Sequence, residues 1–238
     1  MQYLDFDKFK AIDAAEFAST RPYPWINPQG LLTEEGYQRL LDNMPDISLF
    51  EKKFGYERIA GQKPHDRYSL EYTSDTAVPV PWQEFIAELC SDDYRLTLAR
   101  LYGARKINLR FHWHYTPSGC AVSPHTDSVR ERGSQLFYFN REGEWAPEWG
   151  GDTLVLDDGG QLEFASAPTL EDFAGETAAC SLGNYSLIFK RTRHSWHAVR
   201  EIDCPEDRLR RVFIVVANPQ NLYRTLRDRV MRKTVQRF

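Results

Sequence analysis

The chain has 238 residues, of which 42% are hydrophobic and 13% aromatic, and its formal net charge is −4. This length suits one well-buried domain with additions, and the apolar fraction excludes an intrinsically disordered chain. The weakly negative charge gives no reason to expect a nucleic-acid partner.

The first 104 residues are predicted to form a helical N-terminal part. Thr33 precedes apolar residues at helical spacing and can serve as an N-cap. Pro45 ends this helix, because proline cannot continue its backbone hydrogen bonds. Two further helices are predicted at 81–90 and 92–102, where apolar residues recur on one face.

From residue 106 the apolar residues recur with a period of two, which predicts strands. The expected strands are 107–113, 135–139, 153–156, 185–189 and 212–217. Short strands after a helical lead favour a mostly β protein with flanking helices, a sandwich or jelly roll packed on the N-terminal helices. Residues 105–218 are the expected β core. Because no linker-like stretch interrupts the sequence, we expect residues 1–238 to form a single domain.

Residues 219–238 are predicted to form a basic C-terminal helix. This segment holds six basic residues against one acidic residue, and Leu222, Leu226 and Val230 share one face. Such an apolar stripe docks on a barrel wall or on a partner subunit, so a homodimer is an open alternative. We expect no nucleic-acid binding, since the acidic remainder of the chain offers a counter-surface for the basic residues.

The four cysteines are scattered and include no Cys-x-x-Cys pair, which indicates free thiols in a reducing compartment. The first ten residues mix acidic and aromatic residues and contain no apolar run. No secretory signal and no membrane span are therefore expected. These features predict a cytoplasmic protein.

The most informative residues are His125 and Asp127, with His197 further along the chain. Side chains at positions i and i+2 of a strand point to the same face, so His125 and Asp127 can converge on one point. Two imidazoles and one carboxylate on one side of a metal leave the opposite side open, as in the non-haem Fe(II) oxygenases. A His-x-Asp sequence alone arises often by chance, so the surrounding motifs decide whether these are ligands or ordinary core and surface residues.

Several segments around these residues occur in a recognisable order. They are Tyr115-Thr-Pro-Ser-Gly119, His125-Thr-Asp127, Phe137-Tyr-Phe-Asn140, Trp149-Gly-Gly-Asp152, Ser195-Trp-His-Ala-Val199 and Arg210-Arg-Val-Phe213. Their order and spacing resemble the 2-oxoglutarate/Fe(II) oxygenases of the prolyl-hydroxylase type, over roughly residues 100 to 218. The resemblance implies a double-stranded β-helix, which is a jelly-roll barrel.

This resemblance also implies a metal and a reaction. Fe(II) is expected on His125, Asp127 and His197, with 2-oxoglutarate as cosubstrate and dioxygen as oxidant, and no catalytic residue is expected beyond these ligands. The expected reaction is hydroxylation of an unactivated C–H bond in an amino acid, a peptide or protein side chain, or another small molecule. His194 competes with His197 as third ligand, but the family places that ligand in the His-x-Val sequence that begins at His197.

For the cosubstrate, the resemblance places the far carboxylate of 2-oxoglutarate on Arg210 and Tyr138, and it places Tyr115 beside the metal. A guanidinium can hold a carboxylate through two parallel hydrogen bonds. Arg208 and Arg211 are competitors. Because Arg210 and Arg211 point to opposite faces of a strand, only one of them can point into the barrel, and the resemblance favours Arg210. The other interpretation of the two tyrosines is that they are core aromatics.

Two other functions stay open, a cupin-type isomerase or lyase with another divalent metal and a catalytically silent 2-oxoglutarate-binding module. The substrate is not identified, because the barrel is shared by hydroxylases of proteins, amino acids and other small molecules. Loops that choose the substrate are expected at 55–75 and 157–183. His112 and His114 share one strand face near the expected pocket mouth and are interpreted as half-buried structural histidines.

Overall fold

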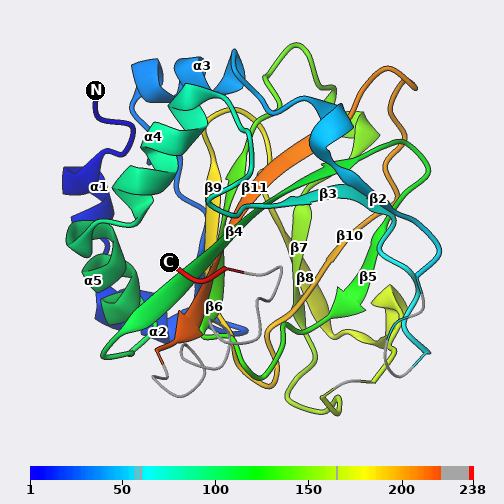
Figure 1. The fold of residues 1–238 in the computed structure, drawn as a ribbon. Coiled ribbons are helices and arrows are strands. Elements are labelled where there is room, and N and C mark those ends of the chain that lie inside the picture. The colour runs from blue at the N-terminus through cyan, green and yellow to red at the C-terminus, as the bar shows by residue number, and fades with distance from the viewer. Residues whose placement is uncertain (57, 59–60, 165, 221–235) are drawn as a thin grey trace.

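A computed structural model describes residues 1–56, 58, 61–164, 166–220 and 236–238 (Figure 1). Within these residues, the strands form two antiparallel sheets that face each other as a jelly roll, which confirms the predicted fold. The large sheet contains, in spatial order, β1 (Trp25–Ile26), β9 (Ser186–Lys190), β6 (Gly133–Tyr138), β11 (Arg210–Pro219), β4 (Ile107–Thr116), β3 (Arg67–Glu71) and β2 (Glu51–Lys53). The small sheet contains β5 (Val122–His125), β10 (Trp196–Val199), β7 (Thr153–Asp157) and β8 (Gly175–Ala179).

Helices cover the outer face of the large sheet (Figure 1). They are α1 (Phe6–Lys10), α2 (Ala14–Ser19), α3 (Glu34–Leu41), α4 (Val80–Leu89) and α5 (Asp92–Leu101), with short 3-10 turns at Ile47–Leu49, Pro147–Trp149 and Leu170–Asp172. The three helices expected from the sequence are confirmed as α3, α4 and α5. Thr33 caps α3 as predicted, because its hydroxyl oxygen accepts a hydrogen bond from the Gly36 N–H at 3.1 Å.

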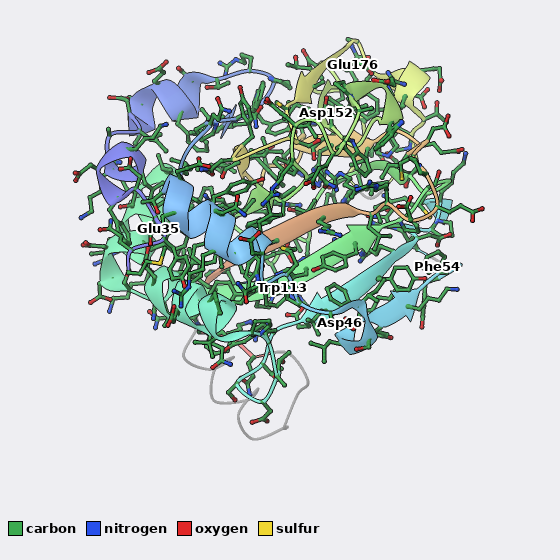
Figure 2. All side chains as sticks on the ribbon, turned by 90° about the horizontal axis from the view of Figure 1, so that it is seen from above. Glu35, Asp46, Phe54, Trp113, Asp152 and Glu176 are labelled. Atoms are coloured by element: carbon green, nitrogen blue, oxygen red, sulfur yellow. The ribbon has the colours of Figure 1, made fainter. Side chains whose placement is uncertain are left out.

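The alternation of side chains along β4 and β11 separates the core from the interior of the barrel. Trp113 on β4 and Phe213 on β11 pair across the two strands and point toward the helices, where Trp82 of α4 packs on both (Figure 2). Their ring centroids lie 4.8 to 5.2 Å apart. Such aromatic pairs contribute about 0.5 to 1.5 kcal/mol each beyond the burial of their area. The residues between them on each strand point the other way, toward the small sheet.

The strands predicted from periodicity are all present, although β4 and β11 run longer than expected. β1, β2 and β3 were not predicted, so the predicted helical N-terminal part, residues 1–104, also contains strands, and β3 pairs with β4 in the large sheet. These strands have two to five residues each, too few for a period to be recognised. β5, β8 and β10 are equally short and form most of the small sheet.

At the C-terminus, the helix was predicted over residues 219–238, of which 221–235 lie outside the described residues; Pro219 belongs to β11, and 236–238 are not helical. The final residue, Phe238, exchanges backbone hydrogen bonds of 2.8 and 2.9 Å with Leu109 and packs its ring on Phe111. In the described part of the chain, no helix combines the length and the apolar character that crossing a membrane requires.

Candidate metal centre

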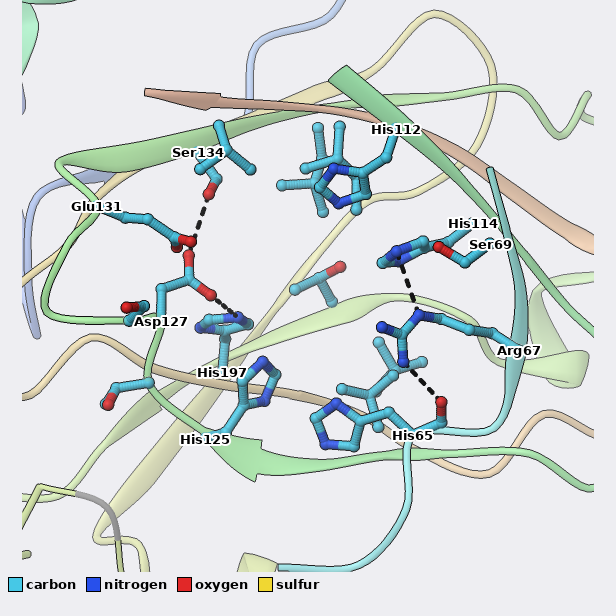
Figure 3. Close-up of a pocket in the computed structure, with 18 of the residues that line it drawn as sticks. His65, Arg67, Ser69, His112, His114, His125, Asp127, Glu131, Ser134 and His197 are labelled. Atoms are coloured by element: carbon cyan, nitrogen blue, oxygen red, sulfur yellow. Dashed lines mark hydrogen bonds and ion pairs between the residues drawn. The ribbon is translucent and has the colours of Figure 1, made fainter. Parts of the chain in front are cut away.

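Strand pairing brings the two predicted histidine ligands together. His125 ends β5 and lies directly opposite His197 in the β5–β10 ladder, and their ring centroids are 4.2 Å apart (Figure 3). Asp127 lies two residues further, in the turn after β5, where its backbone carbonyl accepts a hydrogen bond of 3.1 Å from the Arg191 side chain. Its carboxylate approaches the His197 Nε2 at 3.6 Å. One ligand atom from each of the three residues lies within 4.8 Å of the others.

Neighbouring groups orient these ligands. The Nδ1 of His125 lies 2.9 Å from the carbonyl oxygen of Ser123, and the Nδ1 of His197 lies 3.1 Å from that of Ser195. A proton on each Nδ1 leaves each Nε2 with a free lone pair, which is how metal-binding histidines are commonly held. The Ser134 hydroxyl donates a hydrogen bond of 3.0 Å to one oxygen of Asp127. Burial lowers the pKa of His125 well below its usual value, which keeps this imidazole neutral.

The donor set fits a divalent iron. Two imidazole nitrogens and one carboxylate oxygen lie close together, which is the donor set of the non-haem Fe(II) sites. The competitor His194 lies elsewhere: its Nδ1 pairs with Asp158 at 2.8 Å, and the Trp196 indole N–H donates to the same carboxylate oxygen at 3.2 Å. The structure therefore gathers the three predicted ligands and leaves His194 out.

The three ligands line a cavity of about 370 Å³ between the two sheets (Figure 3). Its wall on the large sheet comes mainly from β3, β4, β6 and β11, and the remaining wall from the small sheet and the preceding loop. Besides the three ligands, the lining includes His65, Arg67, Ser69, Glu71, Arg110, His112, His114, Glu131, Leu136, Thr153, Phe189, Arg210 and Ile214.

Arg210 lies buried in this cavity at the start of β11. Its Nε donates to the Gly151 carbonyl at 2.5 Å and its Nη2 donates to the Thr153 hydroxyl at 3.0 Å. Among the described residues, no carboxylate forms an ion pair with this guanidinium. Arg211 points away, and its backbone N–H donates to Asn140 at 2.8 Å. Because side chains alternate along β11, Arg210 is the arginine that points into the barrel, which is the arginine that the resemblance favoured.

The two predicted tyrosines lie in different places. Tyr138 packs its ring against the Arg210 guanidinium at 5.6 Å, and its hydroxyl donates to Thr153 at 2.9 Å. Burial raises its pKa to about 12, so the hydroxyl keeps its proton. Tyr115 is not part of the cavity, which corrects the expectation of a tyrosine beside the metal. It points to the helical side of β4, stacks on Phe50 at 4.2 Å and donates its hydroxyl to the Pro45 carbonyl.

The Gly150-Gly151 pair has a structural role. Gly151 has a φ of +99°, which L side chains rarely adopt, and a Cβ at this position would lie 3.3 Å from the Arg210 side chain. This glycine thus lets the segment just before β7 approach the guanidinium closely. Its carbonyl oxygen accepts the hydrogen bond that the Arg210 Nε–H donates.

Sequence reasoning missed most of the polar wall on the large sheet. His112 and His114, interpreted as structural histidines, line the cavity, and burial lowers the pKa of His112 to about 3. Arg67 and Glu71 lie on β3, which was not predicted, and Glu131 precedes β6. A usable signal was present on β4, where Arg110, His112 and His114 give one strand face three polar side chains in a row.

Comparisons with known proteins show the fold. No protein-family model and no curated protein matches the chain. Among solved structures, a prolyl-4-hydroxylase from Pseudomonas putida matches at 18% identity and a TM-score of 0.59, over 87% of this chain and 98% of that one. A Trichoplax adhaerens prolyl hydroxylase, solved with a hypoxia-inducible-factor peptide, matches at 12% identity and a TM-score of 0.60, over 96% and 94%. A non-haem α-ketoglutarate-dependent carbocyclase from nogalamycin biosynthesis matches at 11% identity and a TM-score of 0.60, over 89% and 85%. The chain therefore has the fold of the 2-oxoglutarate/Fe(II) oxygenases of the prolyl-hydroxylase type.

Proposed function

We propose that this chain is an Fe(II)- and 2-oxoglutarate-dependent dioxygenase that oxidises an unactivated C–H bond, with hydroxylation as the default outcome. The main support for this proposal is that one cavity contains both a set of metal ligands and a buried arginine that can bind the cosubstrate. His125 and His197 lie on the small sheet and Asp127 lies just after β5, while Arg210 lies buried in the same cavity without a carboxylate partner among the described residues. A buried charge is costly unless it is paired, so the guanidinium calls for an anionic ligand.

The residues have separate roles in this proposal. His125, Asp127 and His197 would hold the iron from one side and leave its opposite side to ligands. Arg210 would bind the far carboxylate of 2-oxoglutarate, while Tyr138 and Thr153 hold the guanidinium in place through ring packing and a hydroxyl contact. When bound, Fe(II) couples oxidative decarboxylation of 2-oxoglutarate by dioxygen to C–H oxidation. Leu136, Phe189 and Ile214 contribute apolar walls that keep bulk water away from the reacting groups.

Two alternatives make different predictions. A cupin-type isomerase or lyase would have no use for a buried guanidinium that awaits a carboxylate. A catalytically silent module would bind 2-oxoglutarate and iron without turnover. The similar solved structures include prolyl hydroxylases and a carbocyclase, which supports the oxygenase class.

The experiment is an anaerobic titration of the purified protein with Fe(II) and 2-oxoglutarate, followed by exposure to air. The oxygenase is expected to give the weak visible metal-to-ligand absorption band and then succinate. A band without succinate under any substrate tested would favour the silent module. Absence of the band, with Fe(II) binding intact, would exclude 2-oxoglutarate as the cosubstrate.

A further inference from the structure

The cavity has a second polar wall, formed by β3 and β4, that the iron and 2-oxoglutarate sites do not use. Glu71 on β3 lies directly opposite His112 on β4 in the strand register. Three buried atoms there have no hydrogen-bond partner among the described residues: Glu71 Oε1, Arg110 Nε and His112 Nδ1. Buried polar atoms are nearly always satisfied, so a polar ligand at this wall would relieve the cost of leaving these three atoms unpaired.

The acidic part of this wall holds two carboxylates, Glu71 and Glu131, that both approach one guanidinium, that of Arg110. Glu131 pairs with Arg110 at 2.9 Å, and Glu71 approaches the same guanidinium only to 3.9 Å. Lys53 also lines the cavity, but its ammonium group pairs with Glu51 at 3.2 Å. His112 lies 3.8 Å from Glu71, and burial lowers its pKa to about 3, so it supplies no charge near neutral pH. In the protein without ligand or metal, burial raises the pKa of Glu131 to about 8 and also raises that of Glu71, and a nearby cation from a ligand would lower both and hold the carboxylates in their charged form. A cationic group from a ligand would complete this set.

The opposite side of the cavity is basic. Arg67 donates hydrogen bonds to the His65 carbonyl at 2.6 Å and to the His114 Nε2 at 3.1 Å, and both acceptors are neutral groups. In the described residues, no carboxylate forms an ion pair with Arg67. Figure 3 shows Arg67 and Glu131 on opposite sides of the cavity, with the metal ligands at its floor. A ligand anion would satisfy Arg67 as a ligand cation would satisfy the acidic side.

We propose that this polar wall is the substrate subsite and that its substrate is a small free amino acid of the basic class, with a carboxylate at one end and a cationic group at the other. The wall consists of Arg67, Glu71, Arg110, His112 and Glu131. This assignment rests on the proposed function and deepens it. The carboxylate would lie on Arg67 and the distal cation on Glu71 and Glu131, which stretches the carbon chain across the cavity above the metal ligands.

Size and charge both favour a free molecule over a protein segment. A cavity of about 370 Å³ is at the small end of the range for ligand pockets, roughly 300 to 1,000 Å³. A residue inside a peptide has a neutral amide in place of its carboxylate and would leave Arg67 unsatisfied. A prolyl ring would also leave the acidic side without a cation, and unpaired buried charges disfavour binding.

The test measures substrate-stimulated succinate formation by the Fe(II)-loaded protein. The probes are L-lysine, L-ornithine and L-arginine, each compared with L-leucine, with L-lysinamide, with Nε-acetyl-L-lysine and with a prolyl peptide. At least one basic amino acid is expected to stimulate succinate formation tenfold or more over leucine. Its amide and its side-chain-acylated form are each expected to lose most of that stimulation.

Two variants assign the two ends. Arg67→Gln should abolish the preference for the free carboxylate over the amide while retaining the preference for the free side-chain cation, and Arg67→Lys should restore part of it. Glu71→Gln should abolish the preference for the free side-chain cation over its acylated form while retaining the preference for the free carboxylate over the amide. A residue with a merely structural role would weaken all probes equally. Glu35 is an exposed carboxylate on α3 (Figure 2) that does not line the cavity, so Glu35→Gln is the matched control and should leave every ratio unchanged.

The outcomes separate this assignment from the proposed function. If the anaerobic absorption band forms but no basic amino acid stimulates turnover, or neutral analogues or the prolyl peptide stimulate it as well, the substrate class is wrong and the oxygenase stands. If both variants lower the response to all probes by the same factor, the subsite is wrong. If the band itself never forms, the proposed function fails and this inference fails with it.

Discussion

Arg210 and Arg211 are neighbours in the chain, but β11 sends their side chains to opposite faces of the large sheet. The same parity separates His114, which lines the cavity, from Tyr115, which packs under the helices. In each case a one-residue shift of the strand would exchange a polar cavity group for a group on the other face. The identity of each site residue is thus set by strand register as much as by its chemistry.

Substitution of the ligand histidine should remove iron binding. His197→Ala is expected to weaken Fe(II) binding more than about 100-fold, because the loss of a ligand exceeds the 10- to 100-fold cost of losing an outer partner. Isothermal titration under anaerobic conditions measures this. His194→Ala is the control and should bind Fe(II) like the parent protein, since His194 pairs with Asp158 outside the cluster. Loss of binding in His194→Ala with retention in His197→Ala would reverse the ligand assignment.

Removal of the buried guanidinium should act on 2-oxoglutarate. Arg210→Ala is expected to raise the 2-oxoglutarate concentration needed for half-maximal absorption by roughly 30-fold or more, since truncation of a buried charge partner costs about 2 to 5 kcal/mol. The affinity for Fe(II) alone should change far less. Arg211→Ala, which alters the neighbouring side chain on the other face, should titrate like the parent. The opposite result for the two variants would move the anchor to Arg211.

At the scale of elements, β11 contacts both the helical layer on one face of the large sheet and the cavity on the other face. It lies between β6 and β4 in the large sheet, its helical face carries Phe213, and its interior face begins with Arg210. Phe213 contacts rings from both α4 and β4, so it joins the helical layer to the sheet. The strand that presents the proposed carboxylate anchor is therefore also the strand that anchors the core.

Truncation of that central ring should destabilise the fold. Phe213→Ala is expected to lower the free energy of unfolding by about 3 to 5 kcal/mol, because it removes a fully buried aromatic and leaves a cavity between α4 and the sheet. Urea unfolding followed by circular dichroism measures the change. Leu96→Ala on α5 is the control, since Leu96 is 63% exposed and its loss should cost no more than about 0.5 kcal/mol. Equal effects of the two substitutions would contradict this description of the core.

Long helices and strands with a clear apolar periodicity were predictable from the sequence, and short ones were not. α4 and β4 each have ten residues, enough for the spacing of Trp82 and Phe85 or of Phe111 and Trp113 to identify a helix or a strand. β3 has five residues of mixed character, and its strand state comes from pairing with β4 far along the chain. The metal ligands were predictable because motif order located them. The charged wall was not, since Arg67 and Glu71 lie on the strand that only tertiary pairing defines.

At the scale of the whole molecule, buried histidines link stability to pH. Burial lowers the pKa of His65 to about 2 and of His112 to about 3, and it lowers those of His114 and His125 well below the usual value. In the unfolded chain each would titrate near 6.5. The folded protein therefore binds fewer protons, and the stability present above pH 6.5 is lost as the pH falls. Glu131 opposes this, because its raised pKa makes the folded state hold a proton up to about pH 8.

The histidines outnumber the opposing carboxyls, so the metal-free protein should be less stable at pH 5 than at pH 7. Denaturant unfolding at several pH values measures the slope. His112→Asn should reduce the slope by up to about 1.4 kcal/mol per pH unit, the value for one proton, between pH 5 and pH 6.5. A free energy of unfolding that stays constant or increases from pH 7 to pH 5 would contradict the linkage.

Iron and 2-oxoglutarate together should stabilise the whole fold, because they bind the folded state alone. At concentrations 100-fold above their dissociation constants each contributes about 2.7 kcal/mol, which raises the Tm measured by scanning calorimetry under anaerobic conditions. His197→Ala should show no rise with Fe(II). A Tm that is equally insensitive in the parent protein would argue against a metal site in this cavity.

The metal ligands and the charged wall have no strand in common. His125 and His197 belong to the small sheet, and Arg67, Glu71, Arg110 and His112 belong to β3 and β4 of the large sheet. Mutation can therefore explore new substrates at β3 and β4 while the iron keeps its three donors. β3 and β4 are accordingly the strands to randomise in directed evolution toward a new substrate. We also expect related enzymes that act on different substrates to differ from one another on these two strands.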